Sequence, residues 1–103
     1  VDIVLFCGHL KNQKHYELSN QLIRSGTAIG ANVEEALEAF TRKDFAYRMS
    51  IASREAVETI YWLRIIKEAG LLPETDLNSL IHRATALKLM LVSIVKTTQD
   101  SLK

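Results

Sequence analysis

The sequence contains few of the residues that tight turns need. Its 103 residues include one proline and four glycines, whereas folds made of many short strands use both residues at frequent turns. This scarcity argues against an all-β fold and favours long helices joined by a few short connections. The single cysteine, Cys7, cannot form an intramolecular disulfide, which is typical of a protein from a reducing compartment.

Long apolar runs are lacking as well. The longest, residues 89–95, is far shorter than the roughly 18 to 20 residues of a membrane-spanning helix. The opening VDIVLFC has neither the basic start nor the cleavage site of a signal peptide. We therefore expect a cytoplasmic protein with no membrane partner. Because the chain starts at Val1 without a methionine, we also expect its first helix to be cut short.

No strong charge of either sign is present. The chain has 13 basic and 12 acidic residues, a net charge of +1, so composition alone predicts no large electrostatic field. Residues 1–41 hold 3 basic and 5 acidic side chains (net −2), which leaves 10 and 7 (net +3) for residues 42–103. Two interpretations are open: an evenly mixed, solvated surface, or a basic face on the second half.

Apolar residues instead recur every seven positions, in alternating steps of four and three, as in helices of a left-handed bundle. This pattern predicts helices over residues 1–12, 16–40, 42–69 and 74–102. The expected core positions are Val1, Val4, Leu5 and Gly8; Leu18, Leu22, Ser25, Ile29, Val33, Ala36 and Phe40; Phe45, Met49, Ala52, Ala56, Thr59, Leu63 and Ile66; and Leu77, Leu80, Ala84, Leu87, Leu91, Ile94 and Thr98. We predict an all-α fold, an antiparallel up-down four-helix bundle in one domain over residues 1–103.

Local signals mark the expected helix ends. Thr41 precedes Asp44 by three residues, as in a capping box. Gly70 is a suitable stop for the third helix, and Pro73 suits the first turn of the fourth, with Thr75 or Asp76 as its cap.

The third and fourth helices carry more apolar surface than one core needs. The surplus residues, which we assign to an oligomer interface, are Tyr61, Trp62, Ile65, Leu89, Met90 and Val92. Surplus apolar faces on a small bundle indicate self-association, so we predict a homo-oligomer.

The stretch RSGTAIGAN (24–32) resembles a phosphate-binding loop only superficially. No strand precedes it, and its two glycines, Gly26 and Gly30, lack the further glycine or the Lys-Ser/Thr pair of such loops. Their spacing of four instead places both on one face of a helix. We predict a narrow helix seam in which they face Ala52 and Ala56.

The same region carries a family resemblance. QLIRSGTAIGANVEEA (21–36) and RKDFAYRMSIASREAVETIYWLRIIKEAGLL (42–72) resemble the four-helix bundle family of proteins encoded in intervening sequences of bacterial 23S rRNA genes. The residues that fall at the family's spacing are Arg24, Ser25, Gly26, Ile29, Gly30, Asn32, Glu35, Asp44, Phe45, Glu55, Ala56, Tyr61, Trp62 and Leu63. The resemblance implies a ring-shaped homopentamer with no established catalytic activity. A related branch, the accessory variability protein of diversity-generating retroelements, binds nucleic acid beside a reverse transcriptase, which implies RNA or DNA as a partner here.

Basic residues of the third and fourth helices are the candidates for binding phosphates. They are Arg42, Lys43, Arg48, Arg54, Arg64, Lys67, Arg83, Lys88 and Lys96. The sequence has no nucleic-acid recognition motif, and its aromatic residues are not expected to interleave with these cations. A protein-binding scaffold without nucleic acid is the alternative.

A polar set of Arg24, Asn32, Glu35 and Glu55 lies near the predicted junction of the second and third helices. It is either a binding site or a structural polar network that fixes helix register, and we favour the network because buried charges need partners.

Carboxylates offer one catalytic alternative. Glu34, Glu35 and Glu38, followed by Glu55 and Glu58, have the helical spacing of a Mg²⁺-dependent nucleotide pyrophosphohydrolase. Because such spacings arise often by chance, we expect a non-enzymatic protein without catalytic residues, metal or cofactor.

Overall fold

The computed structural model describes residues 2–12 and 15–102, and this part of the chain is helical without strands. The four helices are α1 (Asp2–Asn12), α2 (Tyr16–Leu37), α3 (Arg42–Glu68) and α4 (Glu74–Ser101). The four predicted helices are therefore confirmed, although α2 ends three residues before the predicted residue 40. Among the described helices, none is long and apolar enough to cross a membrane.

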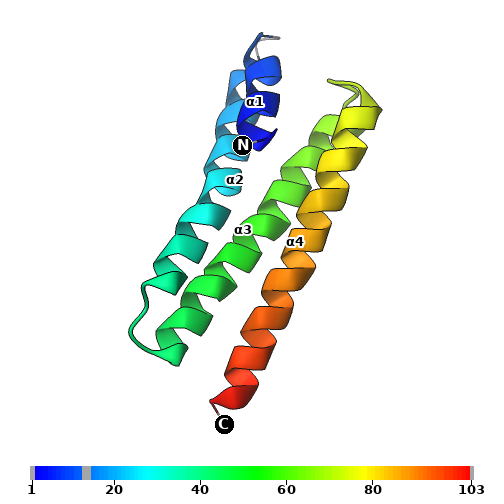
Figure 1. Ribbon diagram of the computed structural model, residues 1–103. Coiled ribbons are helices and arrows are strands. Elements are labelled where there is room, and N and C mark those ends of the chain that lie inside the picture. Colours follow the sequence, from blue (N-terminus) through cyan, green and yellow to red (C-terminus); the bar gives the residue numbers. More distant parts are fainter. Residues whose placement is uncertain (1, 13–14, 103) are drawn as a thin grey trace.

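Helix α3 is the central element of a molecule 48 Å long. Both α2 and α4 pack along α3, whereas the short α1 packs on α2. In Figure 1 the chain runs down through α2, up through α3 and down through α4, with α1 beside the upper part of α2. This order leaves α3 flanked on two sides.

The core consists of two apolar clusters stacked along the bundle. The cluster at the α1 end comprises Phe6, Cys7, Leu22, Leu63, Ile66, Leu77 and Leu80. The cluster at the other end comprises Ile29, Ala36, Met49, Ala52, Ala56 and Leu91. Every predicted core position of α3 except the half-buried Phe45 is buried. The seven-residue pattern therefore places the core face of α3 correctly.

Helix α1 presents a different face to the core than predicted. Val4 and Leu5, expected inside, are 49% and 66% exposed, and the buried residues are Phe6 and Cys7; Val1 lies outside the described residues. The Ser19 hydroxyl donates to the Cys7 carbonyl at 3.3 Å, and the Cys7 thiol approaches the Ser19 carbonyl at 3.6 Å. These paired contacts fix the rotation of α1 on α2.

Capping interactions set the limits of α3. The Asp44 backbone N–H donates to the Thr41 hydroxyl at 3.1 Å, as the predicted capping box requires. At the other end Gly70 has a positive φ of 67°, and the Leu71 N–H donates to the Ile66 carbonyl at 3.2 Å. This is a Schellman motif, which needs a residue that tolerates the left-handed conformation.

Two predictions at helix ends are wrong. Phe40, expected in the core, is fully exposed because α2 ends at Leu37 and the chain turns before Phe40 can continue the helical stripe. Pro73 occupies the N-cap position of α4 without a side-chain cap bond, so Thr75 and Asp76 lie inside the first turns rather than capping it.

The predicted glycine seam against α3 is also wrong. A Cβ at Gly26 would lie 2.9 Å from Cγ2 of Ile3, so Gly26 permits the close approach of α1. A Cβ at Gly30 would meet no atom within 4 Å. Ala52 and Ala56 are buried in the cluster that includes Ile29 of α2. The spacing correctly predicts that the two glycines share one helix face, but it does not predict that this face lies against α1 at Gly26.

Replacing the two glycines by alanine is expected to have opposite effects on the stability of the protein. Gly30→Ala is expected to raise the free energy of unfolding by about 1 kcal/mol, because alanine favours helix by roughly that amount and its methyl group meets open space. Gly26→Ala is expected to lower it, because Ile3 must shift. Urea unfolding of both variants measures the difference. Destabilisation by Gly30→Ala would show that its surface is covered in solution.

Candidate nucleic-acid interface

An ion-pair network joins α2 to α3. Arg24 of α2 donates to Glu55 of α3 at 3.3 Å and also pairs with Glu58. The indole N–H of Trp62 donates to Glu58 at 3.3 Å. The side chain of Arg24 is 49% exposed, so these pairs contribute little stability individually. Their geometry matches a structural network that fixes the register of α2 and α3.

The predicted four-residue network divides into separate parts. Asn32 donates to the Ala28 carbonyl of its own helix at 2.8 Å and does not join Arg24. Glu35 forms an ion pair with Arg48 at 3.4 Å. Glu58 completes the Arg24 cluster but is absent from the predicted set. Its position, three residues after Glu55 and so on the same helix face, is the signal that identifies it.

Helix α3 exposes a continuous row of side chains opposite its buried face. We call this row the outer stripe; it consists of Lys43, Tyr47, Ser50, Arg54, Val57, Tyr61 and Arg64. Its members follow one another in steps of four and three, so they share one face of the helix. Tyr47, Val57 and Tyr61 are 60%, 50% and 56% exposed. The outer stripe is therefore open to solvent along most of α3.

Helix α4 borders the outer stripe and adds basic residues. A groove of about 290 Å³ brings Tyr61 and Arg64 together with Lys88. A second groove of about 530 Å³ lies between Lys43, Tyr47, Ser50 and the last turns of α4. The residues that share these two grooves show how α3 and α4 are aligned, and this alignment places Lys96 at the level of Ser50. Lys88 and Lys96 therefore extend the positive surface sideways.

The charges of α3 are unevenly distributed. The outer stripe holds three cations, Lys43, Arg54 and Arg64, and exposed carboxylates lie at its two ends, Asp44 beside Lys43 and Glu68 four residues beyond Arg64. Glu55 and Glu58 face Arg24 of α2 instead. The expectation about aromatic residues is wrong, because Tyr47 and Tyr61 alternate with the cations along the helix.

Four predicted basic residues lie elsewhere. Arg42 donates to the Ser101 hydroxyl at 2.8 Å, and Arg48 pairs with Glu35. Lys67 is half-buried in the last turn of α3, where a cation interacts favourably with the helix dipole. Arg83 lines an apolar groove on the other side of α4. The predicted basic set is thus not one surface.

The apolar groove lies between α2 and α4, next to the start of α1. It has a volume of about 430 Å³. Its walls are formed by Ile3, Gly26, Ile29, Gly30, Val33, Glu34, Thr59, Leu80, Arg83, Ala84 and Leu87. Here α2 and α4 each pack on α3 rather than on one another, which accounts for the open space at Gly30.

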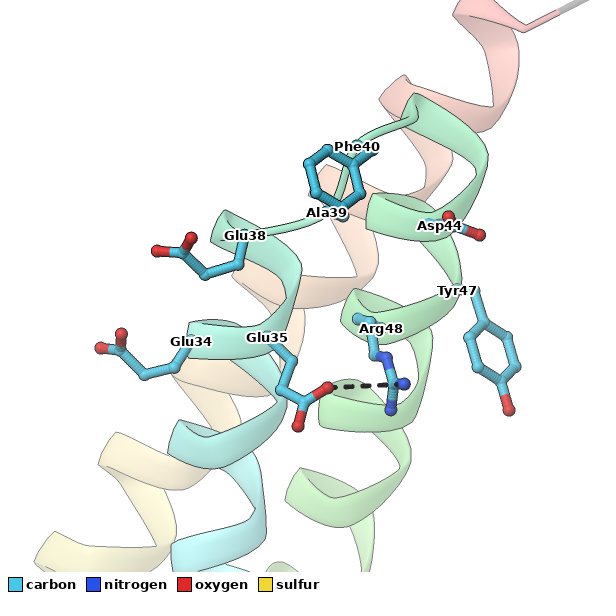
Figure 2. A pocket seen from close by; sticks show the side chains of 8 residues that line it. All are labelled: Glu34, Glu35, Glu38, Ala39, Phe40, Asp44, Tyr47 and Arg48. Carbon is cyan, nitrogen blue, oxygen red and sulfur yellow. Dashed lines mark ion pairs between the residues drawn. The ribbon is translucent and has the colours of Figure 1, made fainter.

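An acidic pocket of about 630 Å³ lies where α2 meets the start of α3. Figure 2 shows Glu35 directed toward Arg48, while Glu34 and Glu38 point away from α3 and Asp44 lies on its far side. Across residues 2–12 and 15–102, no group of three or more described acidic, His or Cys side chains is arranged to hold a metal ion. The carboxylates of the hydrolase alternative therefore do not converge.

The predicted oligomer residues occupy several sides of the molecule. Tyr61 belongs to the outer stripe, while Trp62 packs against the core at the α1 end. Leu89 and Met90 are 59% and 57% exposed on α4. Their helical positions point away from α3, whereas Val92 turns toward the outer stripe.

Comparison with known proteins identifies relatives of the chain. Residues 1–93 match the family described as 23S rRNA-intervening sequence protein. A crystal structure from Bacteroides thetaiotaomicron, a protein of unknown function from the S23 ribosomal protein family, is 39% identical with a TM-score of 0.89. The match covers 91% of this chain and 88% of that one. No curated protein shows significant similarity to the chain.

Removing a member of the ion-pair network is expected to lower the stability of the fold without weakening any binding of RNA. Arg24→Ala and Glu55→Ala are each expected to lower the free energy of unfolding by about 0.5 to 1 kcal/mol, as partly exposed pairs do. The matched control, Arg54→Ala on the exposed outer stripe, is expected to leave stability within about 0.5 kcal/mol. Urea unfolding measures both. A normal stability for Arg24→Ala together with lost RNA binding would identify a binding site instead.

Proposed function

The chain belongs to the family of 23S rRNA-intervening sequence proteins, and we propose that it is a non-enzymatic helical bundle that binds RNA or DNA through the outer stripe of α3. The observation that carries the proposal is the separation of charge on α3. Between Lys43 and Arg64 its outer stripe has cations and tyrosines, with the carboxylates Asp44 and Glu68 at the two ends, while Glu55 and Glu58 face α2. A row of cations along one helix suits a phosphate backbone.

The non-enzymatic part of the proposal rests on the placement of the carboxylates. Glu55 and Glu58 are engaged by Arg24, and Glu35 is engaged by Arg48. A magnesium-dependent hydrolase needs several carboxylates directed at one ion. The resemblance to the accessory variability branch supports nucleic acid over a phosphate-transfer substrate.

A second observation favours self-association. Leu89 and Met90 are neighbours in sequence and both more than half exposed on α4. Apolar residues in that position are typical of a protein interface. We propose a homo-oligomer, a pentamer as the family resemblance implies, that assembles through this side of α4 and leaves the outer stripe accessible. A scaffold that binds only protein is the alternative.

The binding proposal is tested by titrating labelled RNA and DNA at two salt concentrations. Lys43→Ala, Arg54→Ala and Arg64→Ala are each expected to weaken binding and to reduce the slope of log affinity against log salt by about 0.7 to 0.9 per lost phosphate contact. Arg83→Ala removes the same charge on the apolar-groove side and serves as the matched control. Binding that is absent at low salt, or that falls equally in the control, would contradict the proposal.

The assembly proposal is tested by the mass in solution. Met90→Glu introduces a charge into the exposed apolar pair and is expected to lower the mass toward that of one 11.6 kDa chain. Thr27→Glu, at an exposed position of α2 away from α4, is the control for added charge. A wild-type protein that is already monomeric would refute assembly and leave the nucleic-acid proposal intact.

A further inference from the structure

The outer stripe carries more than positive charge. Along α3 its large side chains follow the order Lys43, Tyr47, Arg54, Tyr61 and Arg64. Cations and aromatic rings therefore alternate between Lys43 and Arg64, which are 21 positions apart, or about 31 Å at 1.5 Å per residue. A ligand that matches this row has negative charges and flat, unpaired rings along one line.

Both tyrosine rings are supported from the protein side. The Tyr61 ring meets Trp62 edge-on at 5.1 Å between centroids, and Trp62 is itself bonded to Glu58. The Arg48 guanidinium lies over the Tyr47 ring at 5.7 Å, and Arg48 is held by Glu35. Each ring nevertheless remains more than half exposed. Held yet exposed rings lose little freedom when a base stacks on them.

The shape of the molecule disfavours reading a duplex. The major groove of B-DNA is about 12 Å wide and admits one helix. Helix α3 is flanked by α2 and α4, and the bundle measures 20 by 17 Å across its length. It is therefore too broad to enter that groove with α3 in front. On a duplex surface the two tyrosines would contact sugars and phosphates rather than bases, because the flat faces of the bases are stacked inside the duplex.

We propose that the outer stripe binds single-stranded nucleic acid laid along α3, with a base stacked on each of Tyr47 and Tyr61 and phosphates near Lys43, Arg54 and Arg64. This rests on the proposed function and specifies its ligand. The grooves beside the two tyrosines, about 530 and 290 Å³, give the intervening nucleotides room between α3 and α4. Exposed aromatic rings in a basic groove are the general means of holding single strands without a fixed sequence.

The test compares one 15-nucleotide DNA, labelled with fluorescein, as a single strand and as a duplex with its complement. The single strand is expected to bind more tightly to the full chain. Tyr47→Ala and Tyr61→Ala are each expected to weaken single-strand binding at least about fivefold, as the loss of one stacked base implies, and to change duplex binding little. Tyr47→Phe and Tyr61→Phe keep the ring and are expected to bind normally.

Trp62 provides a local readout, since it is the chain's one tryptophan and contacts Tyr61. Single-strand binding is expected to change its fluorescence, and Tyr61→Ala is expected to reduce that change. The mass of each variant is measured alongside, so that lost assembly is not mistaken for lost stacking. Equal or tighter duplex binding, with tyrosine variants that behave normally, would overturn this inference and leave the proposed function standing. No binding of either form at low salt would overturn both.

Discussion

The packing of α3 against two helices at once is the constraint from which the other features follow. Small residues, Ala52 and Ala56, let one face of α3 lie close to its neighbours, and close packing recovers dispersion energy that a looser contact would lose. With two sides engaged, α3 has one face left for solvent. Carboxylates beside α2 are matched by Arg24, so the solvent face retains an excess of cations. The candidate interface is thus a consequence of how the bundle is built.

The repeat in the sequence predicts much of this architecture because helices α3 and α4 are long. Over 27 residues, a seven-residue pattern determines which face is buried. Helix α1 has 11 residues, too few to fix its phase, and contacts such as Ser19 with Cys7 decide its rotation. The glycines illustrate another limit. Spacing places Gly26 and Gly30 on one helix face, but only the packed structure shows Ile3 as the neighbour.

The candidate site was predictable in composition but not in arrangement. The basic residues are visible in the sequence, but two of them lie apart from Arg54. Arg48 forms an ion pair with Glu35, and Arg83 lines the apolar groove. The spacing of the two tyrosines in the sequence could have predicted that they share a helix face with Arg54. Tyr47 and Tyr61 are 14 residues apart, two full repeats of the pattern that defines the core, with Arg54 midway. A search for periodicity among polar and aromatic residues, as well as apolar ones, would have found the outer stripe.

Backbone amide chemical shifts, measured with and without a single-stranded oligonucleotide, locate the binding surface residue by residue. The largest shifts are expected along the exposed face of α3 from Lys43 to Arg64 and in the adjoining turns of α4 around Lys88, while α2 near Arg24 changes little. Shifts concentrated in the apolar groove around Gly30 or in the acidic pocket around Glu34 would rule out binding at the outer stripe. So would an unchanged spectrum at saturating oligonucleotide and low salt.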